Sequence, residues 1–287
     1  MQRIGYLGPK GTFTKMAADA FFEEGSFIGY ESIPACLDAV ESGDVDLGVV
    51  PIENAIEGSV HLTIDYLIHE VNQAVIAELT VPIQQHLLVH PDYDGGGFTH
   101  IYSHSQALAQ CQQYLYKNYP TAELSYTAST GRAAEIVAEK GIHTAAIGNH
   151  LAAEQTGLTI LKANIHDYEN NHTRFAVVQK TPSPLNAGNH SIQKHKTTIM
   201  VTLPKDYVGA LHQVLSAFAW RKMNLSKIES RPMKTGLGNY FFLIDVDQPF
   251  DDVLFPGVKA ELEMLGCKLK LLGTYPSYLM EINSPNS

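Results

Sequence analysis

The sequence predicts an α/β protein in which a two-lobed domain is followed by a smaller βαββαβ domain. Two observations predict this fold class. Short apolar segments alternate with amphipathic segments through the first 180 residues. After residue 196 the predicted elements instead follow the order βαββαβ. Alternating strands and helices are typical of a parallel or mixed sheet with helices on its faces. The length of 287 residues exceeds the usual single domain and favours two.

The first part of the chain supplies the alternating elements. Apolar runs predict strands at 4–7, 27–30, 47–52, 79–89 (as one or two strands), 99–102, 123–126, 144–147 and 176–178. Amphipathic periodicity predicts helices at 12–22, from Ser32 onward, and at 105–116, 130–140 and 150–155. The helix after Ser32 has Pro34 in its first turn, where proline is favoured.

A linker separates the two parts of the chain. Residues 181–196 contain two Ser/Thr-Pro steps and almost no apolar side chains, which is typical of a connecting segment. Beyond it, strands are predicted at 197–203, 225–231, 240–247 and 268–275, and helices at 209–221 and 253–265. This order is the ferredoxin-like βαββαβ arrangement.

Composition and charge exclude several classes of function. The formal net charge is -10, from 20 Lys plus Arg against 30 Asp plus Glu, which makes nucleic acid and anionic membranes poor partners. No apolar run reaches the 18 residues of a membrane span, and Gly8-Pro9 comes too early for a secretory segment. Cys36, Cys111 and Cys267 form no CxxC pair and lie in apolar stretches, as buried thiols of a reducing compartment do. We expect a cytoplasmic protein.

Turns that join a strand end to a helix start offer hydroxyl groups beside free backbone N–H groups. They are Gly8–Thr14 (GPKGTFT), Ser103–Gln106 (SHSQ) and Ser129–Gly131 (STG). Helix N-termini carry unpaired N–H groups and a partial positive charge, so several of them at one cleft would bind a carboxylate. Ordinary capping explains each turn taken singly.

Two further segments concentrate polar groups at strand ends. In Asn170–Phe175 (NNHTRF), Arg174 is suited to grip a carboxylate and Thr173 to donate to a neighbouring oxygen. In Val49–Gly58 (VVPIENAIEG), a buried strand ends in a loop that carries carboxylates and an amide. A salt-bridged surface turn and a solvated loop are the simpler alternatives.

Histidine spacing gives no metal site. His86 and His90 are four apart, but in a strand this separation is about 13 Å, too far to share one ion. His100 and His104 lie on either side of a predicted strand end without a carboxylate or cysteine at matching spacing. No Walker loop or GxGxxG pattern is present.

Taken together, these strings resemble the prephenate dehydratases, which convert prephenate to phenylpyruvate in phenylalanine biosynthesis. The matching strings occur in family order over nearly the whole chain: GYLGPKGTFT from Gly5, VPIENAIEG from Val50, SHSQALAQC from Ser103, STGRAA from Ser129, AAIGNHLAA from Ala145, NHTRF from Asn171, GALH from Gly209 and NLSKIESRP from Asn224. Departures from the family pattern are mild, at Ala55, Gly131, Met223 and Ser226.

The resemblance implies an architecture. Residues 1–180 would fold like a type 2 periplasmic binding protein, with lobe one at about 1–77 and 162–180, lobe two at about 78–161, and the active site in the cleft. Residues 197–280 would form an ACT domain that binds phenylalanine as feedback inhibitor. The protein would be a homodimer or homotetramer and would need no metal and no organic cofactor.

The resemblance also assigns roles to residues of the cleft. Thr173 would donate a hydrogen bond to the departing hydroxyl of prephenate, with Glu53 or a water completing proton delivery. Because the ring carboxylate becomes neutral CO2, we expect Arg174 to hold the other, pyruvyl carboxylate while Phe175 faces the departing one. The remaining substrate contacts are predicted at Thr12, Asn54, Ser103, Gln106, Ser129 and Thr130.

An amino-acid effector needs an acceptor for its ammonium, donors for its carboxylate and an apolar slot. The residues predicted to supply these in the ACT domain are Gly209, Ala210, Leu211, His212, Asn224, Leu225, Glu229, Ser230 and Arg231. A structural role of the Glu229–Pro232 string is the alternative. Two other functions stay open: an aromatic-metabolite sensor that has lost turnover, and an arogenate dehydratase, which acts on the amino analogue of prephenate.

Overall fold

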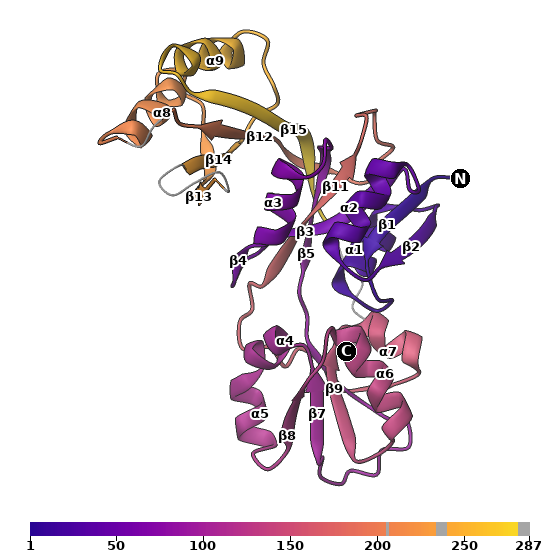
Figure 1. The fold of residues 1–287 in the computed structure, drawn as a ribbon. Helices are drawn as coiled ribbons and strands as arrows, with labels where there is room; N and C mark the ends of the chain where they lie inside the picture. Colours follow the sequence, from indigo (N-terminus) through magenta and orange to yellow (C-terminus); the bar gives the residue numbers. More distant parts are fainter. Residues whose placement is uncertain (205–206, 234–239, 281–287) are drawn as a thin grey trace. The chain divides into compact units, whose positions relative to one another are not determined.

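The structure is a computed structural model that describes residues 1–204, 207–233 and 240–280. The chain forms two compact units (Figure 1). The first unit comprises Met1–Val71 and Leu79–Val177 and resumes at Met280. The second comprises Asn72–Glu78 and Val178–Leu279, so a short segment from early in the chain folds with the C-terminal part.

Lobe one of the first unit is built on a sheet of order β5-β11-β3-β1-β2. Its strands are β1 (Arg3–Leu7), β2 (Ser26–Tyr30), β3 (Leu47–Asn54), β4 (Gly58–Ser59), which pairs with β3, β5 (Ala74–Pro82) and β11 (His172–Gln179). Its helices are α1 (Phe13–Phe21), α2 (Ile33–Ser42) and α3 (His61–His69). Because β1 runs parallel to both β2 and β3, these strands end at one edge of the sheet.

Lobe two is built on a separate sheet of order β10-β6-β9-β7-β8. Its elements are β6 (His86–Val89), β7 (His100–Ser103), α4 (Ser105–Gln110), α5 (Gln112–Asn118), β8 (Glu123–Tyr126), α6 (Thr130–Lys140), β9 (Thr144–Gly148), α7 (His150–Thr156) and β10 (Thr159–Lys162). One core cluster packs α4 and α5 against the sheet and another packs α6 and α7, so helices cover both faces (Figure 1). The predicted two-lobed α/β class is confirmed.

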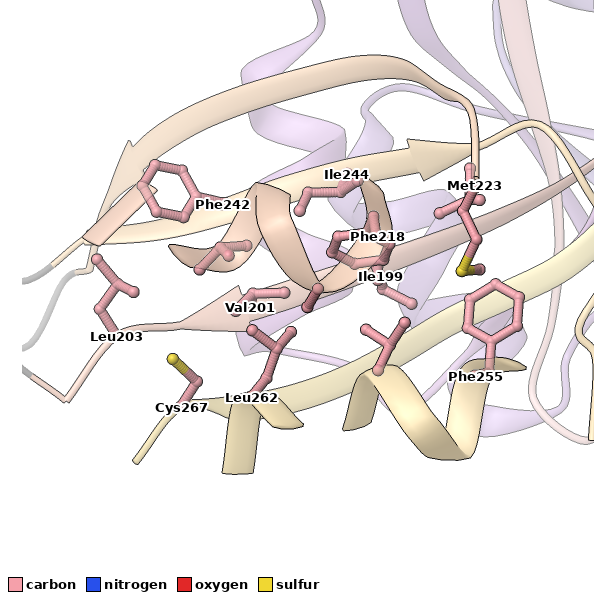
Figure 2. Packing of buried hydrophobic residues seen from close by; sticks show 14 of the residues in the cluster. Ile199, Val201, Leu203, Phe218, Met223, Phe242, Ile244, Phe255, Leu262 and Cys267 are labelled. Atoms are coloured by element: carbon pink, nitrogen blue, oxygen red, sulfur yellow. The ribbon is translucent and has the colours of Figure 1, made fainter. Parts of the chain in front are cut away.

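The second unit has the predicted order of strands and helices. Its elements are β12 (Ile192–Thr202), α8 (Ala210–Ala219), β13 (Leu225–Pro232), β14 (Tyr240–Val246), α9 (Leu254–Met264) and β15 (Lys268–Leu279), and the sheet order is β13-β14-β12-β15. Phe218 of α8 and Leu262 of α9 pack on Val201 and Ile244 of the sheet (Figure 2). Both helices therefore cover one face of this antiparallel sheet.

Some elements differ from the sequence prediction. Helix α3 and the short strand β10 were not predicted, and the helix predicted at 105–116 breaks at Cys111 into α4 and α5. Strand β12 begins at Ile192, inside the predicted linker, because Ile192 and the polar residues Lys194 to Lys196 pair with β15 rather than turning. The three cysteines are free and buried, as predicted. Among the described residues, no helix combines the length and apolar character of a membrane span.

Candidate active site

The carboxyl ends of strands from both lobes lead into the same region of the first unit. In lobe one, β1 ends before the loop that carries Thr12, and the parallel strand β3 ends at Asn54. In lobe two, β7 runs parallel to β8 and β9, and helices α4, α6 and α7 begin where these strands end. Ligands of open α/β sheets bind at this edge.

A cavity of about 190 Å³ lies at these strand ends. It is lined by Leu7, Thr12, Phe13, Thr14, Pro51, Asn54, Ile83, Gln85, His104, Gln106, Ala107, Gln110, Ala128, Ser129, Thr130, Thr173 and Phe175. These residues include Thr12, Asn54, Gln106, Ser129, Thr130, Thr173 and Phe175 of the predicted site. Side chains up to 168 positions apart in the chain, Leu7 and Phe175, thus share one hollow of the first unit.

Helix starts surround this cavity. Thr12 caps α1 by accepting a hydrogen bond from the Lys15 N–H at 3.3 Å, and Ser129 caps α6 by accepting one from the Arg132 N–H at 3.1 Å. His104 caps the short helix α4. The partial positive charge of helix N-termini therefore reaches the cavity from both lobes, as an anion site requires.

The lining of the cavity combines polar and apolar side chains and is uncharged. It contains hydroxyls, amides and one imidazole, and none of its residues is Lys, Arg, Asp or Glu. An adjoining cavity of about 630 Å³ shares Thr12 and Ser129 with it and brings in the cationic residues Lys10 and Arg132 together with the carboxylate of Glu31. A dianionic ligand would meet hydrogen-bond donors in the inner cavity and cations in the outer one.

Four side-chain amides form a continuous hydrogen-bonded series, the amide chain (Asn54, Asn171, Gln110 and Gln85). Asn54 Nδ2 donates to Asn171 Oδ1 at 3.1 Å, and Asn171 Nδ2 donates to Gln110 Oε1 at 3.1 Å. Gln85 Nε2 also donates to Gln110 Oε1, at 3.4 Å. Asn171, Gln110 and Gln85 are buried.

Backbone groups fix the direction of this amide chain. Asn54 Oδ1 accepts from the N–H groups of Ile56 at 3.0 Å and Glu57 at 3.3 Å, so the Asn54 NH2 group must face the other way. It donates to Thr173 Oγ1 at 2.9 Å. A hydroxyl oxygen that accepts from an amide keeps its own hydrogen for another acceptor. Thr173 is therefore oriented as a hydrogen-bond donor.

Arg174 and Glu53 do not line the cavity. Successive side chains of a strand point to opposite faces, so Arg174 lies on the other face of β11 from Thr173 and Phe175. Its Nη1 donates to Glu53 Oε2 of the neighbouring strand β3. In this structure the expected grip on a substrate carboxylate is replaced by an ion pair within the protein.

Ser103 also lies outside the lining of the cavity. It is fully buried, and its hydroxyl donates to the Ile147 carbonyl at 2.7 Å, which ties β7 to β9. Its neighbour in the same turn, Gln106, lines the cavity and donates through Nε2 to Glu57 Oε2 of lobe one. Burial raises the pKa of Glu57.

The sequence reasoning missed Gln85, Gln110 and His104 as cavity residues. His104 Nδ1 accepts from the Gln106 N–H at 3.4 Å, so the neutral ring carries its hydrogen on Nε2. Burial lowers the pKa of His104, which favours that neutral form. Gln110 follows Gln106 by four residues and so shares its helix face, a signal that could have been read. Gln85 carried no such signal.

The predicted effector residues lie at two ends of the second unit. Gly209 precedes α8 with φ +89°, and Asn224 follows α8, whose 10 residues span about 15 Å. Leu211 and His212 are exposed on the first turn of α8, and Ala210 is buried. On β13, Leu225 and Glu229 are half-buried, Ser230 is exposed, and buried Arg231 donates to Glu229 at 3.0 Å.

No site for a metal ion emerges from the residues that the structure describes. None of their His, Cys, Asp and Glu side chains form a group of three or more that could hold an ion. His86 begins β6 and His90 follows the end of that strand, while His104 lies beyond the end of β7.

Comparisons with known proteins agree with one another. Residues 4–183 match the family model described as "Prephenate dehydratase". The prephenate dehydratase of Bacillus subtilis (strain 168) is 50% identical over 282 residues, which cover 96% of this chain and 99% of that protein.

Solved structures show the same likeness. The prephenate dehydratase of Arthrobacter aurescens, solved in complex with L-Phe, is 34% identical with a TM-score of 0.81, and the match covers 95% of this chain and 89% of that one. The prephenate dehydratase of Staphylococcus aureus is 30% identical with a TM-score of 0.80, and the match covers 95% of this chain and 99% of that one.

Proposed function

The chain belongs to the prephenate dehydratase family, and we propose that the cavity lined by Thr173 and Phe175 is where this lyase acts on prephenate. The reaction breaks the bond between the ring and its carboxylate, moves that electron pair into the ring, and expels the ring hydroxyl with the electrons of its C–O bond. The products are phenylpyruvate, CO2 and hydroxide, which takes up a proton to become water.

The observation that carries the proposal is the hydrogen bond from Asn54 Nδ2 to Thr173 Oγ1. It turns the Thr173 hydrogen away from Asn54 and makes it available to the departing hydroxyl. Negative charge grows on that oxygen as the C–O bond breaks, so the hydrogen bond strengthens in the transition state. A threonine hydroxyl is a very weak acid, so full proton transfer from Thr173 is not required.

The two carboxylates of prephenate would contact different parts of the cavity lining. The departing carboxylate loses its charge, so contact with the buried ring of Phe175 favours the neutral product over the anion. The pyruvyl carboxylate keeps its charge and would bind at the starts of α1 and α6, beside Thr12, Ser129 and Thr130. Lys10 and Arg132 of the adjoining cavity add positive charge on that side.

We assign Arg174 and Glu53 a positioning role in this reaction. Their ion pair links β11 to β3 beside the residues that hold the amide chain, and the Ala55 N–H donates to the His172 carbonyl at 2.8 Å across the same strands. The pair would thereby maintain the alignment that brings Asn54 to Thr173. It is absent from the cavity lining and would not contact prephenate.

Substitutions at Thr173 and Asn54 test the donor role. We expect Thr173→Ala to lower kcat about 100-fold with little change in KM, because the lost interaction forms in the transition state. Asn54→Asp should lower kcat further than Asn54→Ala, because a carboxylate would draw the Thr173 hydrogen away from the substrate. Steady-state turnover of prephenate measures both effects, and a Thr173→Ala enzyme at the normal rate would overturn the role.

We expect the enzyme to prefer prephenate to arogenate. Arogenate carries an ammonium group that needs an acceptor, preferably a carboxylate. No carboxylate lines the inner cavity among the described residues, and the carboxylate of the adjoining cavity, Glu31, shares that lining with the cations Lys10 and Arg132. Parallel incubation of the enzyme with prephenate and arogenate measures the preference. Faster turnover of arogenate would contradict this assignment.

We further propose that phenylalanine inhibits the enzyme by binding to the second unit, as in an ACT domain. The Arthrobacter aurescens protein, similar over 95% of this chain, was solved with L-Phe. Gly209 and Asn224 lie at opposite ends of α8, so one copy of the unit does not bring them together. A homodimer in which α8 of one copy meets β13 of another would complete the site. Calorimetry that detects no binding at millimolar phenylalanine would remove this proposal.

A further inference from the structure

The amide chain ends in an oxygen that has no partner among the described residues. Gln85 Oε1 is buried, and no donor lies within hydrogen-bond distance of it. The Gln85 side chain is 3% exposed and lines the inner cavity together with Thr173. A buried acceptor without a donor destabilises a protein, so such groups call for an explanation.

The direction of the amide chain explains why this end of Gln85 is an oxygen. Asn171 Oδ1 is occupied by Asn54, so Asn171 must donate to Gln110, and Gln110 therefore presents its oxygen to both Asn171 and Gln85. Gln85 must then donate its NH2 group to Gln110. The backbone N–H groups that orient Asn54 thus also determine that the free end of Gln85 is an acceptor.

We propose that Gln85 Oε1 accepts a hydrogen bond from the ring hydroxyl of prephenate, which makes Gln85 a positioning residue for the departing group. This rests on the proposed function. At neutral pH both carboxylates of prephenate are ionised and its keto oxygen carries no hydrogen. The ring hydroxyl is then the single hydrogen-bond donor that the substrate has, and an acceptor in the cavity has no other group of prephenate to bind.

Donor and acceptor together define the position of one oxygen. The ring hydroxyl of prephenate would accept a hydrogen bond from Thr173 and donate one to Gln85. A lone pair of its oxygen would then face Thr173, and its hydrogen would face Gln85 Oε1. As the C–O bond breaks, negative charge grows on the leaving oxygen, so the hydrogen bond that it accepts from Thr173 strengthens, while the bond to Gln85 keeps the oxygen in position. A ligand without the hydroxyl would leave Gln85 Oε1 unpaired and bind less well than its size predicts.

The test compares two ligands that differ only at this hydroxyl. Prephenate turnover is measured together with the Ki of a 4-deoxy analogue, in which hydrogen replaces the ring hydroxyl. The variants are Gln85→Met, which keeps the length of the side chain, and Gln85→Leu, which is one atom shorter; both remove the acceptor together with the amide that donates to Gln110. Gln84→Leu is the matched control, because Gln84 is the neighbour in the chain that does not line the cavity. Thermal midpoints establish that each variant is folded.

We expect both Gln85 variants to lower kcat/KM for prephenate by about tenfold, the effect of one lost neutral hydrogen bond. The Ki of the deoxy analogue should stay unchanged or decrease, because that ligand never used the acceptor. An equal loss for both ligands would indicate a structural role and overturn the proposal, as would normal kcat/KM in a folded Gln85 variant. A wild-type enzyme that does not turn over prephenate would instead refute the proposed function.

Discussion

At the scale of single residues, the orientation of one amide decides which groups of the cavity donate. Asn54 Oδ1 is held by two backbone N–H groups, and this alone makes Thr173 a donor and Gln85 an acceptor. Such a chain needs no charged residue, which suits a reaction in which a carboxylate must lose its charge. A cation fixed beside the departing carboxylate would stabilise the substrate more than the transition state.

At Gly131 the backbones of the two lobes lie close together. A Cβ atom built on it would lie 2.6 Å from the Lys10 carbonyl oxygen, so α6 of lobe two packs directly on the loop before α1 of lobe one. Asn149 Nδ2 reinforces this contact by donating to the Gly11 carbonyl at 3.1 Å.

We therefore predict that Gly131→Ala destabilises the enzyme, although Gly→Ala usually stabilises a helix. The added methyl group would push α6 away from the loop that carries Thr12, with a cost of about 1–3 kcal/mol in unfolding free energy and a decrease in kcat/KM of about tenfold. Gly97→Ala is the control, since a Cβ there meets no atom within 4 Å. Denaturant unfolding and prephenate kinetics measure the two effects, and equal behaviour of the two variants would contradict the prediction.

At the scale of elements, the alternation of β11 separates the side chains that line the cavity from the side chain of the ion pair. Thr173 and Phe175 face the cavity, while Arg174 pairs with Glu53 on the other face. Thr173 and Arg174 are adjacent in the sequence but have different surroundings, because successive side chains of a strand point to opposite faces.

The ion pair between β11 and β3 predicts non-additive variants. We expect Arg174→Gln and Glu53→Gln each to lower kcat/KM about tenfold, and the double variant to be no worse than the poorer single one, because both remove the same contact. The measurement is a double-mutant cycle on prephenate turnover. If Arg174→Gln raises KM while Glu53→Gln behaves normally, the guanidinium binds substrate as first expected from the sequence.

Strand β6 contains a histidine that makes stability depend on pH. Burial, with smaller contributions from His150 and His166, lowers the pKa of His86 to about 4, and its Nδ1 accepts from the Asn164 N–H at 3.1 Å. The unfolded chain binds a proton at this residue below about pH 6.5, whereas the folded protein does so only near pH 4.

Acidification from pH 6.5 to 4 should therefore decrease the unfolding free energy, by up to about 3 kcal/mol from His86. This contribution is complete above pH 6.5 and is lost as the pH falls. His86→Gln keeps an acceptor but cannot be protonated, so its unfolding free energy should vary less over this range. Urea unfolding at a series of pH values measures the difference, and identical slopes for both proteins would refute the assignment.

At the scale of the whole molecule, the proposed catalysis and the proposed regulation belong to different units. The first unit contains the cavity, and the second contains the βαββαβ elements on which the effector residues lie. The segment Asn72–Glu78 belongs to the second unit although β5 continues into the first, so the two share a strand.

Mixed dimers test whether two copies build the effector site. We expect Gly209→Ala, which strains a residue at φ +89°, and Asn224→Ala each to abolish phenylalanine inhibition. If the site combines Gly209 of one copy with Asn224 of the other, a mixed dimer of the two variants regains one intact site. Co-purification through two different tags and inhibition assays measure this. Absence of recovery in verified mixed dimers would show that each site lies within one chain.

The sequence by itself determined the local features of this protein. Hydrophobic periodicity and capping residues predicted most helices and strands, the βαββαβ order and the helix starts at Thr12 and Ser129, because these depend on residues within a few positions of one another. The family strings led to Thr173 and Phe175, both of which line the cavity.

Only the tertiary structure decided which side chains meet. Gln85, Gln110 and Asn171 are joined although they are far apart in the chain, and no periodicity records such a contact. The direction of the Arg174 side chain likewise depends on which face of β11 lies against the cavity. Ser103 is also decided by tertiary structure, because its hydroxyl donates to the Ile147 carbonyl of β9. Local patterns determine elements, whereas hydrogen bonds between distant segments form only once the sheets have been assembled.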